Sequence, residues 1–152
     1  MTFRRGVRLG VDVGTVRIGV ARCDPDGILA TPLPNVPRGE GDVAALVALA
    51  AEFDAMEVIV GLPLTLAGTS GPAVTSVTEF ATALAAALAV PVRMVDERLS
   101  TAAAQRTLFA AGRDTRSSRS TIDGAAATLI VQSAVDFEKS TGTPAGRTVE
   151  IR

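Results

Sequence analysis

The chain has 152 residues, of which 47% are hydrophobic and 20% are charged. This length suits one domain, and the apolar content is sufficient for one buried core, which excludes a generally disordered chain. There is no histidine, which excludes catalytic triads, histidine general bases and histidine metal ligands. Because the net charge is −1, any binding of a polyanion must come from local basic patches.

The sequence predicts a cytoplasmic protein without a membrane segment. Its single cysteine, Cys23, allows no intramolecular disulfide, which is typical of a reducing compartment. Asp12 and Arg17 interrupt the apolar segment after the first arginines, so that segment is neither a signal peptide nor a span of ~18 apolar residues. We expect Cys23 to be an inert core residue; a disulfide between two copies of the chain is the alternative.

The first part of the chain predicts three antiparallel strands. Residues 7–13 and 17–23 are rich in β-branched residues and are joined by a tight turn at 14–16. The turn sequence at 24–27 leads to a third strand over 28–36, which Pro32 and Pro34 limit.

After a loop at 37–41, apolar runs and turn residues predict two βα units and a last pair of helices. The expected helices cover 43–53, 72–89, 100–110 and 121–139, and the expected strands cover 56–61 and 91–95. Asp42 and Ser100 are the expected N-caps of the first and third helices. The polar segment 111–120 is expected to be a loop.

This order predicts an α/β fold with a mixed five-stranded sheet flanked by helices. Three antiparallel strands come first and parallel βα units follow, which is compatible with the ribonuclease H-like topology and also with other α/β folds. We expect one domain over residues 1–139 and a flexible C-terminal tail over 140–152.

Asp12 is the first candidate for chemistry. It lies within an apolar strand, where a charge is costly unless it is paired or binds a metal. Alternation places it on the same face as Gly10 and Gly14, which leave room for a ligand to approach the backbone. This pattern favours a functional acid over one that faces solvent.

Further acids follow other elements. Asp96 and Glu97 come directly after an expected strand, where groups face the ligand crevice of an α/β sheet. We prefer Glu97 as the ligand, with Asp96 secondary and an ion pair with Arg98 as the alternative. Asp123 falls in the first turn of the last expected helix, where taken alone it would be structural.

Together, Asp12, Glu97 and Asp123 come from three separate elements and provide hard oxygen ligands, which suit Mg²⁺ or Mn²⁺. Nucleases that use two metal ions hold them with shared carboxylates. The spacing alone is a weak signal, because any α/β protein has scattered acids.

Two segments could contact phosphates. The loop that begins at Gly61 contains glycines and hydroxyls and leads into a helix, but an ordinary βα connection explains it equally well. Arg113, Arg116 and Arg119 recur along the 111–120 segment and suit contact with a nucleic-acid backbone; a solvated loop is the alternative. The chain has no Tyr or Trp, so base stacking should contribute little.

Several of these segments resemble the YqgF family, also called RuvX, and the resemblance runs from about Leu9 to Asp136. The matching segments are 10–21 (GVDVGTVRIGVA), 60–64 (VGLPL) with Gly68 and Thr69, 96–101 (DERLST) and 122–127 (IDGAAA). Ser100 stands where the family often has threonine, and residues 111–120 have arginines where lysines are frequent; both departures leave the substrate preference open.

The resemblance implies a ribonuclease H-like, cytoplasmic nuclease that matures the 5′ end of pre-16S ribosomal RNA. It carries the family's acidic triad onto Asp12, Glu97 and Asp123. From this resemblance and the segments above, we also expect nucleic-acid contacts from Thr15, Arg17, Gly61, Arg98, Arg113, Arg116 and Arg119.

Structured RNA is the expected partner of a monomer or homodimer. Relatedness to RuvC-type resolvases makes a four-way DNA junction the alternative substrate, for which a two-fold symmetric dimer is expected. A further alternative is a non-catalytic nucleic-acid-binding assembly factor, which would not need the acids. An actin-like or sugar-kinase-like ATPase is a fourth reading, since those proteins share the core fold, but the chain is too short for their two-domain cleft.

Overall fold

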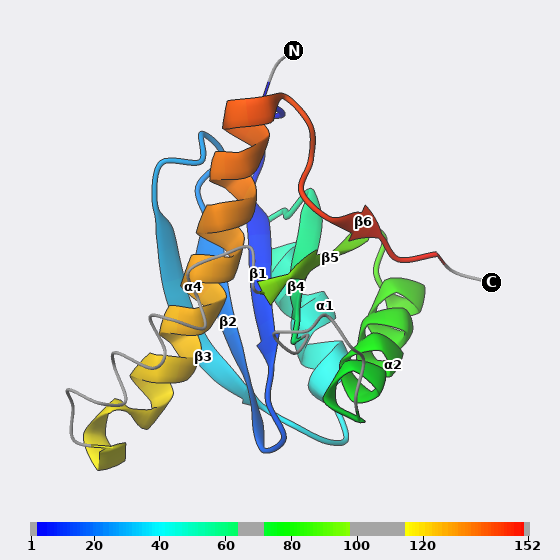
Figure 1. The fold of residues 1–152 in the computed structure, drawn as a ribbon. Helices are drawn as coiled ribbons and strands as arrows, with labels where there is room; N and C mark the ends of the chain where they lie inside the picture. Colours follow the sequence, from blue (N-terminus) through cyan, green and yellow to red (C-terminus); the bar gives the residue numbers. More distant parts are fainter. Residues whose placement is uncertain (1–2, 64–71, 98–114, 151–152) are drawn as a thin grey trace.

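The computed structural model of the protein describes residues 3–63, 72–97 and 115–150, with the backbone alone for residues 115–123. Its strands are β1 (Arg8–Val13), β2 (Arg17–Cys23), β3 (Ala30–Pro37), β4 (Glu57–Leu62), β5 (Val92–Asp96) and β6 (Arg147–Thr148). Its helices, within the described residues, are α1 (Asp42–Glu52), α2 (Pro72–Ala87) and α4 (Thr115–Thr141). Figure 1 shows α4 lying across one face of the sheet, with α1 and α2 against the other.

The sheet has the predicted mixed topology. Its strand order is β3-β2-β1-β4-β5-β6, in which β1, β2 and β3 are antiparallel neighbours. The strands β1, β4 and β5 run parallel to one another, as expected for βα units. The expected α/β architecture is therefore confirmed.

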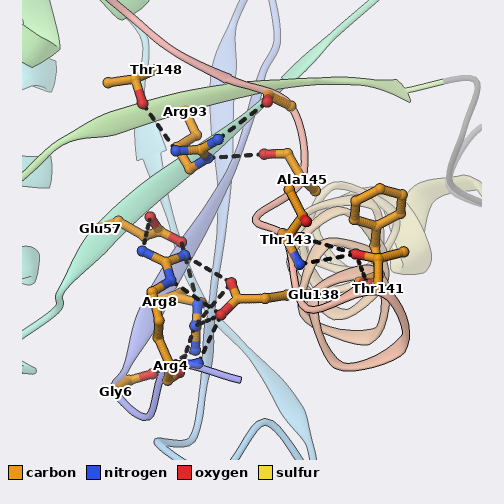
Figure 2. Close-up of polar contacts among 12 residues, drawn as sticks. Arg4, Gly6, Arg8, Glu57, Arg93, Glu138, Thr141, Thr143, Ala145 and Thr148 are labelled. Carbon is orange, nitrogen blue, oxygen red and sulfur yellow. Dashed lines mark hydrogen bonds and ion pairs between the residues drawn. The ribbon is translucent and has the colours of Figure 1, made fainter. Parts of the chain in front are cut away.

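The predicted number of strands, five, is wrong for the described residues. A sixth strand, β6, pairs antiparallel with β5 within the segment expected to be a loose tail. It is only two residues long and both are exposed, so it has no apolar alternation that could predict it. Side-chain bonds hold it instead: Arg93 on β5 donates to the Ala145 and Gly146 carbonyl oxygens and to Thr148 Oγ1 (Figure 2).

Two helix ends differ from the expectation. The N-cap of α1 is Gly41, in a left-handed conformation, and Asp42 is the first helical residue instead of the cap. The last helix begins at Thr115, six residues before the expected Thr121, because the small polar residues that suggested a loop continue the helix. The helix expected at 100–110 lies outside the described residues.

The sheet separates two apolar cores. On the α1 and α2 side, residues such as Leu9, Val11 and Val60 pack against both helices. On the α4 side the sheet offers small residues, and a Cβ added at Gly10 would lie 2.6 Å from the Ala127 carbonyl oxygen. Helix α4 therefore packs directly against the backbone of β1.

Four ionised side chains join the start of β1 to the end of α4. Glu138 accepts hydrogen bonds from Arg4 Nη2 at 2.7 Å and Arg8 Nη2 at 3.2 Å (Figure 2). Glu57 accepts from the same two arginines, at 2.9 Å and 3.3 Å. In this ionic cluster the side chains of Arg8, Glu57 and Glu138 are at most 3% exposed, whereas Arg4, at 38%, lies between them and solvent.

Cys23 is fully buried in the core under α4, which agrees with the expected apolar role and leaves it out of reach of a second chain. Burial raises the pKa of its thiol, and the nearby charge of Asp24 raises it further. Across the part of the chain that the structure describes, no helix is both long and apolar enough to cross a bilayer.

The outer edge of the sheet is rich in proline. Strand β3 pairs with β2 on one side only, and three of its eight residues are Pro32, Pro34 and Pro37. Proline lacks a backbone N–H, and within sheets it is largely confined to such edge strands.

Candidate active site

The candidate acids gather where the parallel strands end. Asp12 is the fifth residue of β1, and Glu97 directly follows β5. Because β1, β4 and β5 are adjacent and parallel, their carboxyl ends lie at the same edge of the sheet. The fold thus places both acids on one edge although 85 positions separate them in the sequence.

A cavity of about 300 Å³ contains both acids. Its described lining comes from β1 and the turn after it, from the end of β4 and the start of α2, and from two charged residues near the ends of β3 and β5. The lining residues are Asp12, Val13, Gly14, Thr15, Arg38, Gly61, Pro63, Ala73, Ser76, Val77 and Glu97. Of the predicted site residues, Asp12, Thr15, Gly61 and Glu97 are therefore brought together.

Gly61 lets helix α4 approach β4 closely beside the two acids. It lies on β4, the strand between β1 and β5, so Asp12 and Glu97 approach from either side of it. A Cβ at this position would meet Ile130 Cδ1 at 2.6 Å and Glu97 Cγ at 3.7 Å. Glycine here lets α4 pack closely and leaves room beside the buried Glu97 side chain.

The turn after β1 fixes one wall of the cavity. The Gly14 N–H donates to the Arg17 carbonyl oxygen at 3.0 Å, and a Cβ on Gly14 would lie 2.5 Å from that oxygen. Any larger residue would therefore open the turn that carries Thr15 past Asp12.

Arg38 is a lining residue that the sequence pattern did not reveal. It follows β3, in a loop whose glycines and charges gave no specific functional signal. Its Nη1 donates to the Gly14 carbonyl oxygen at 2.8 Å, and its Nη2 donates to Ser76 Oγ on α2 at 3.2 Å. These contacts bring it into the cavity from a distant part of the sequence.

Two predicted residues lie elsewhere. Arg17 begins β2 and is not among the described residues that line the cavity, although its carbonyl oxygen closes the turn. Asp96, the last residue of β5, lines a different and mostly apolar cavity of about 370 Å³ beside α4. Of the two consecutive acids, only Glu97 shares a cavity with Asp12.

The remaining candidates cannot be placed in the cavity from the structure. Arg98 and Arg113 lie outside the described residues, as does most of the loop after Gly61. Asp123, Arg116 and Arg119 are part of α4, where the structure describes the backbone and not these side chains. Among the side chains that it does describe, no three acids or cysteines are close enough to hold a metal ion.

The donor set nevertheless fits a hard divalent cation. Asp12 and Glu97 provide carboxylate oxygens within one cavity, and Gly61 contributes no side chain between them. Mg²⁺ and Mn²⁺ prefer such oxygen ligands and often use only one or two carboxylates, with water and substrate phosphate completing the shell.

Comparison with solved structures identifies the fold. The RuvC of Thermus thermophilus, solved in complex with a Holliday junction substrate, superposes with a TM-score of 0.59 at 16% identity, covering 93% of this chain and 99% of that one. A second structure of the same RuvC gives a TM-score of 0.57. The protein thus has the ribonuclease H-like fold expected from its sequence.

Sequence comparison identifies the family. The family model RuvX, described as Holliday junction resolvase, matches residues 6–137. A relative from Nocardioides sp., named "Putative pre-16S rRNA nuclease", is 52% identical and covers 97% of this chain and 99% of its own. A relative of the same name from Streptomyces coelicolor is 50% identical, covering 98% and 91%.

The fold and the curated relatives define a nuclease of the ribonuclease H-like class, a phosphodiester hydrolase that binds nucleic acid. The chain belongs to the RuvX family. Nucleases of this class depend on divalent metal ions.

Proposed function

We propose that the protein is an endonuclease that uses Mg²⁺ or Mn²⁺ to process the 5′ end of pre-16S ribosomal RNA. The observation that carries this proposal is the cavity in which Asp12 and Glu97 meet over Gly61. The shared name of the curated relatives supports the substrate, since they match this chain over nearly its full length. Such a substrate also supports a cytoplasmic location.

We assign Asp12, Glu97 and Asp123 as the metal ligands. The packing of α4 along β1 supports the third assignment. Glu138 on α4 contacts Arg8 at the start of β1, and Ala127 lies against Gly10 in its middle. Residues four apart share one face of a helix, so the next turn back from Ala127 brings position 123 toward the Asp12 end of the strand.

The chain's own residues set the geometry of the reaction. Asp12 is fixed by a strand with neighbours on both sides, and Glu97 is buried against α4's side of the sheet, so neither acid must be ordered when substrate arrives. When bound, a divalent ion supplies Lewis acidity and lowers the pKa of a coordinated water. The cavity of about 300 Å³ that both acids line leaves space for the phosphodiester.

Residues 1–139 form the nuclease domain in this proposal, and residues after 140 add β6 at the sheet edge. A monomer suffices for cutting one RNA strand. The alternative substrate is a four-way DNA junction, which the description of the family as Holliday junction resolvase favours and which would require a dimer.

A side-by-side assay tests the substrate. The full-length protein is incubated with labelled RNA that spans the 5′ end of mature 16S rRNA, and separately with a labelled four-way DNA junction, with Mn²⁺, with Mg²⁺ and with a chelator. We expect discrete, metal-dependent cleavage of the RNA. Paired symmetric cuts in the junction with intact RNA would favour the resolvase, and metal-independent binding of the RNA without cleavage would favour an assembly factor.

The arginines before Asp123 provide a second test. We propose that Arg113, Arg116 and Arg119 contact the backbone of the substrate, together with Arg98, Arg17 and Thr15. Replacing the first three by alanine should weaken binding and lower the slope of log K against log salt by about 0.7–0.9 for each phosphate that is no longer neutralised. The control is Arg5→Ala, which removes an exposed arginine paired with Asp26. An unchanged slope in the triple variant would remove these arginines from the interface.

A further inference from the structure

Arg38 lines the same cavity as Asp12 and Glu97. Its backbone N–H donates to the Val16 carbonyl oxygen at 2.9 Å, and its guanidinium lies over the ring of Phe80, 5.2 Å from the centroid. Together with the bonds to Gly14 and Ser76, these contacts hold the side chain between the β1–β2 turn and α2. The side chain is 24% exposed, so it is fixed in position yet reachable.

The pairing of Arg38 differs from that of the structural arginines. Arg4 and Arg8 donate to Glu57 and Glu138 at 2.7–3.4 Å, so two carboxylates neutralise two guanidinium groups. By contrast, both terminal nitrogens of Arg38 donate to uncharged oxygens. The Asp42 carboxylate lies 3.7 Å from Nε, beyond a good hydrogen bond.

The hydrogen bonds of Arg38 to Gly14 and Ser76 do not use all of its donors. A guanidinium has five N–H groups, and each terminal nitrogen has two. One N–H of Nη1 and one of Nη2 are used by Gly14 and Ser76. One further N–H on each terminal nitrogen is left for an anion such as a phosphate, which guanidinium groups bind strongly.

The charges that line the cavity also favour a phosphate-binding role for Arg38. Its described lining contains two acids, Asp12 and Glu97, and one basic residue, Arg38. A phosphodiester entering it would be repelled by the acids unless cations face it. A bound metal neutralises the acids' side, and Arg38 is the described lining residue that supplies positive charge from the chain itself.

We propose that Arg38 binds a backbone phosphate of the nucleic acid next to the one being cleaved, and so sets the register of the strand in the site. The inference rests on the proposed nuclease function. Its ligand is the phosphodiester backbone, which is common to RNA and DNA. The bonds to Gly14 and Ser76 orient the guanidinium before substrate binds, so little side-chain entropy is lost on contact.

The test measures binding separately from cleavage. Affinity for the labelled rRNA precursor is followed by fluorescence anisotropy over a series of KCl concentrations with Arg38→Gln and Arg38→Lys. We expect Arg38→Gln to weaken binding about tenfold and to reduce the salt slope by about one. Arg38→Lys should retain the wild-type slope because it keeps the charge, while losing the bidentate geometry and part of the affinity.

Arg22→Gln is the matched control, because Arg22 also lies over an aromatic ring, that of Phe53 at 4.9 Å, but is not among the cavity-lining residues. If Arg38 only holds the Gly14 turn, Arg38→Gln will leave the salt dependence of binding unchanged, and both Arg38 variants will lower kcat. That result overturns the inference. If the wild-type protein cleaves the RNA but Arg38→Gln has the same salt slope as the wild type, the role of Arg38 is refuted and the nuclease function stands. If the wild-type protein binds the RNA without cleaving it, and Arg38→Gln lowers the salt slope, the nuclease function is refuted and the role of Arg38 stands. If the wild-type protein does not bind the RNA, both are refuted.

Discussion

The Asp12→Asn variant is expected to lose metal-dependent cleavage by more than about a hundredfold while remaining folded. Removal of a mere outer-shell partner of a metal ligand typically costs 10–100-fold, so loss of a direct ligand should cost more. Asparagine is nearly isosteric with aspartate but carries no charge, so the metal loses one anionic oxygen. The measurement is the single-turnover cleavage rate of the rRNA precursor with Mn²⁺, alongside Mn²⁺ affinity by calorimetry.

The Asp12→Asn variant should keep its fold, because asparagine has nearly the same size and shape as aspartate, and its melting temperature is measured alongside the rate. Asp26→Asn is the control, because Asp26 is an exposed acid in a surface ion pair with Arg5. A wild-type rate in Asp12→Asn would refute the assignment of the acids, whereas a fall in the control would point to a general effect of lost negative charge.

The Glu138→Gln variant is expected to unfold about 10 °C below the wild type, corresponding to a loss of about 3–5 kcal/mol. Glu138 is 2% exposed and accepts bonds from the Arg4 backbone N–H, the Arg4 side chain and Arg8. Without its charge, two arginines face the single carboxylate of Glu57, and Arg8 is left as an undercompensated buried cation. Scanning calorimetry at neutral pH measures the difference.

The stability that Glu138 contributes to the fold should depend on pH. Burial raises the pKa of Glu138, but the hydrogen bonds from Arg4 and the charge of Arg8 outweigh it and hold the pKa below its usual value of 4.5. The carboxylate therefore stabilises the fold fully above about pH 4.5, and this contribution is lost as the pH falls through the lowered pKa. The stability gap between wild type and Glu138→Gln should shrink in that acidic range.

Glu79→Gln provides the comparison for this experiment, since Glu79 lies on α2 and takes no part in the ionic cluster. Its melting temperature should stay within a degree or two of the wild type at every pH, as for most surface substitutions. Equal and small shifts in both variants would show that the ionic cluster contributes nothing to stability.

The main strands of the sheet could be predicted because each one depends on the pattern of residues within its own segment. Alternation and turn residues located β1 and β2 to within one residue, and short apolar runs located β4 and β5. The strand β6 could not be found in this way, since its pairing depends on Arg93, more than fifty positions earlier. The ionic cluster in which Glu57 and Glu138 share Arg4 and Arg8 could not be predicted either, because it forms only once α4 packs against β1.

The residues of the candidate site also differ in whether the sequence could predict them. Asp12 and Glu97 could be proposed from the sequence because acids at the ends of parallel strands share an edge, and the cavity that they line agrees with this reasoning. Arg38 could not, since nothing in its neighbours indicates that its guanidinium reaches Gly14 and Ser76. Asp123 remains a prediction supported by the helical repeat of α4.

The prolines of β3 have a consequence for how this protein can associate. An uncovered edge strand usually offers a row of amide hydrogens to which another chain can add a strand of its own. With Pro32, Pro34 and Pro37 spread over an eight-residue strand, that row is broken in three places. Continuous hydrogen-bonded growth of the sheet beyond β3 is thereby blocked, which protects the protein from aggregating through this edge and excludes an unbroken strand pairing of two copies there.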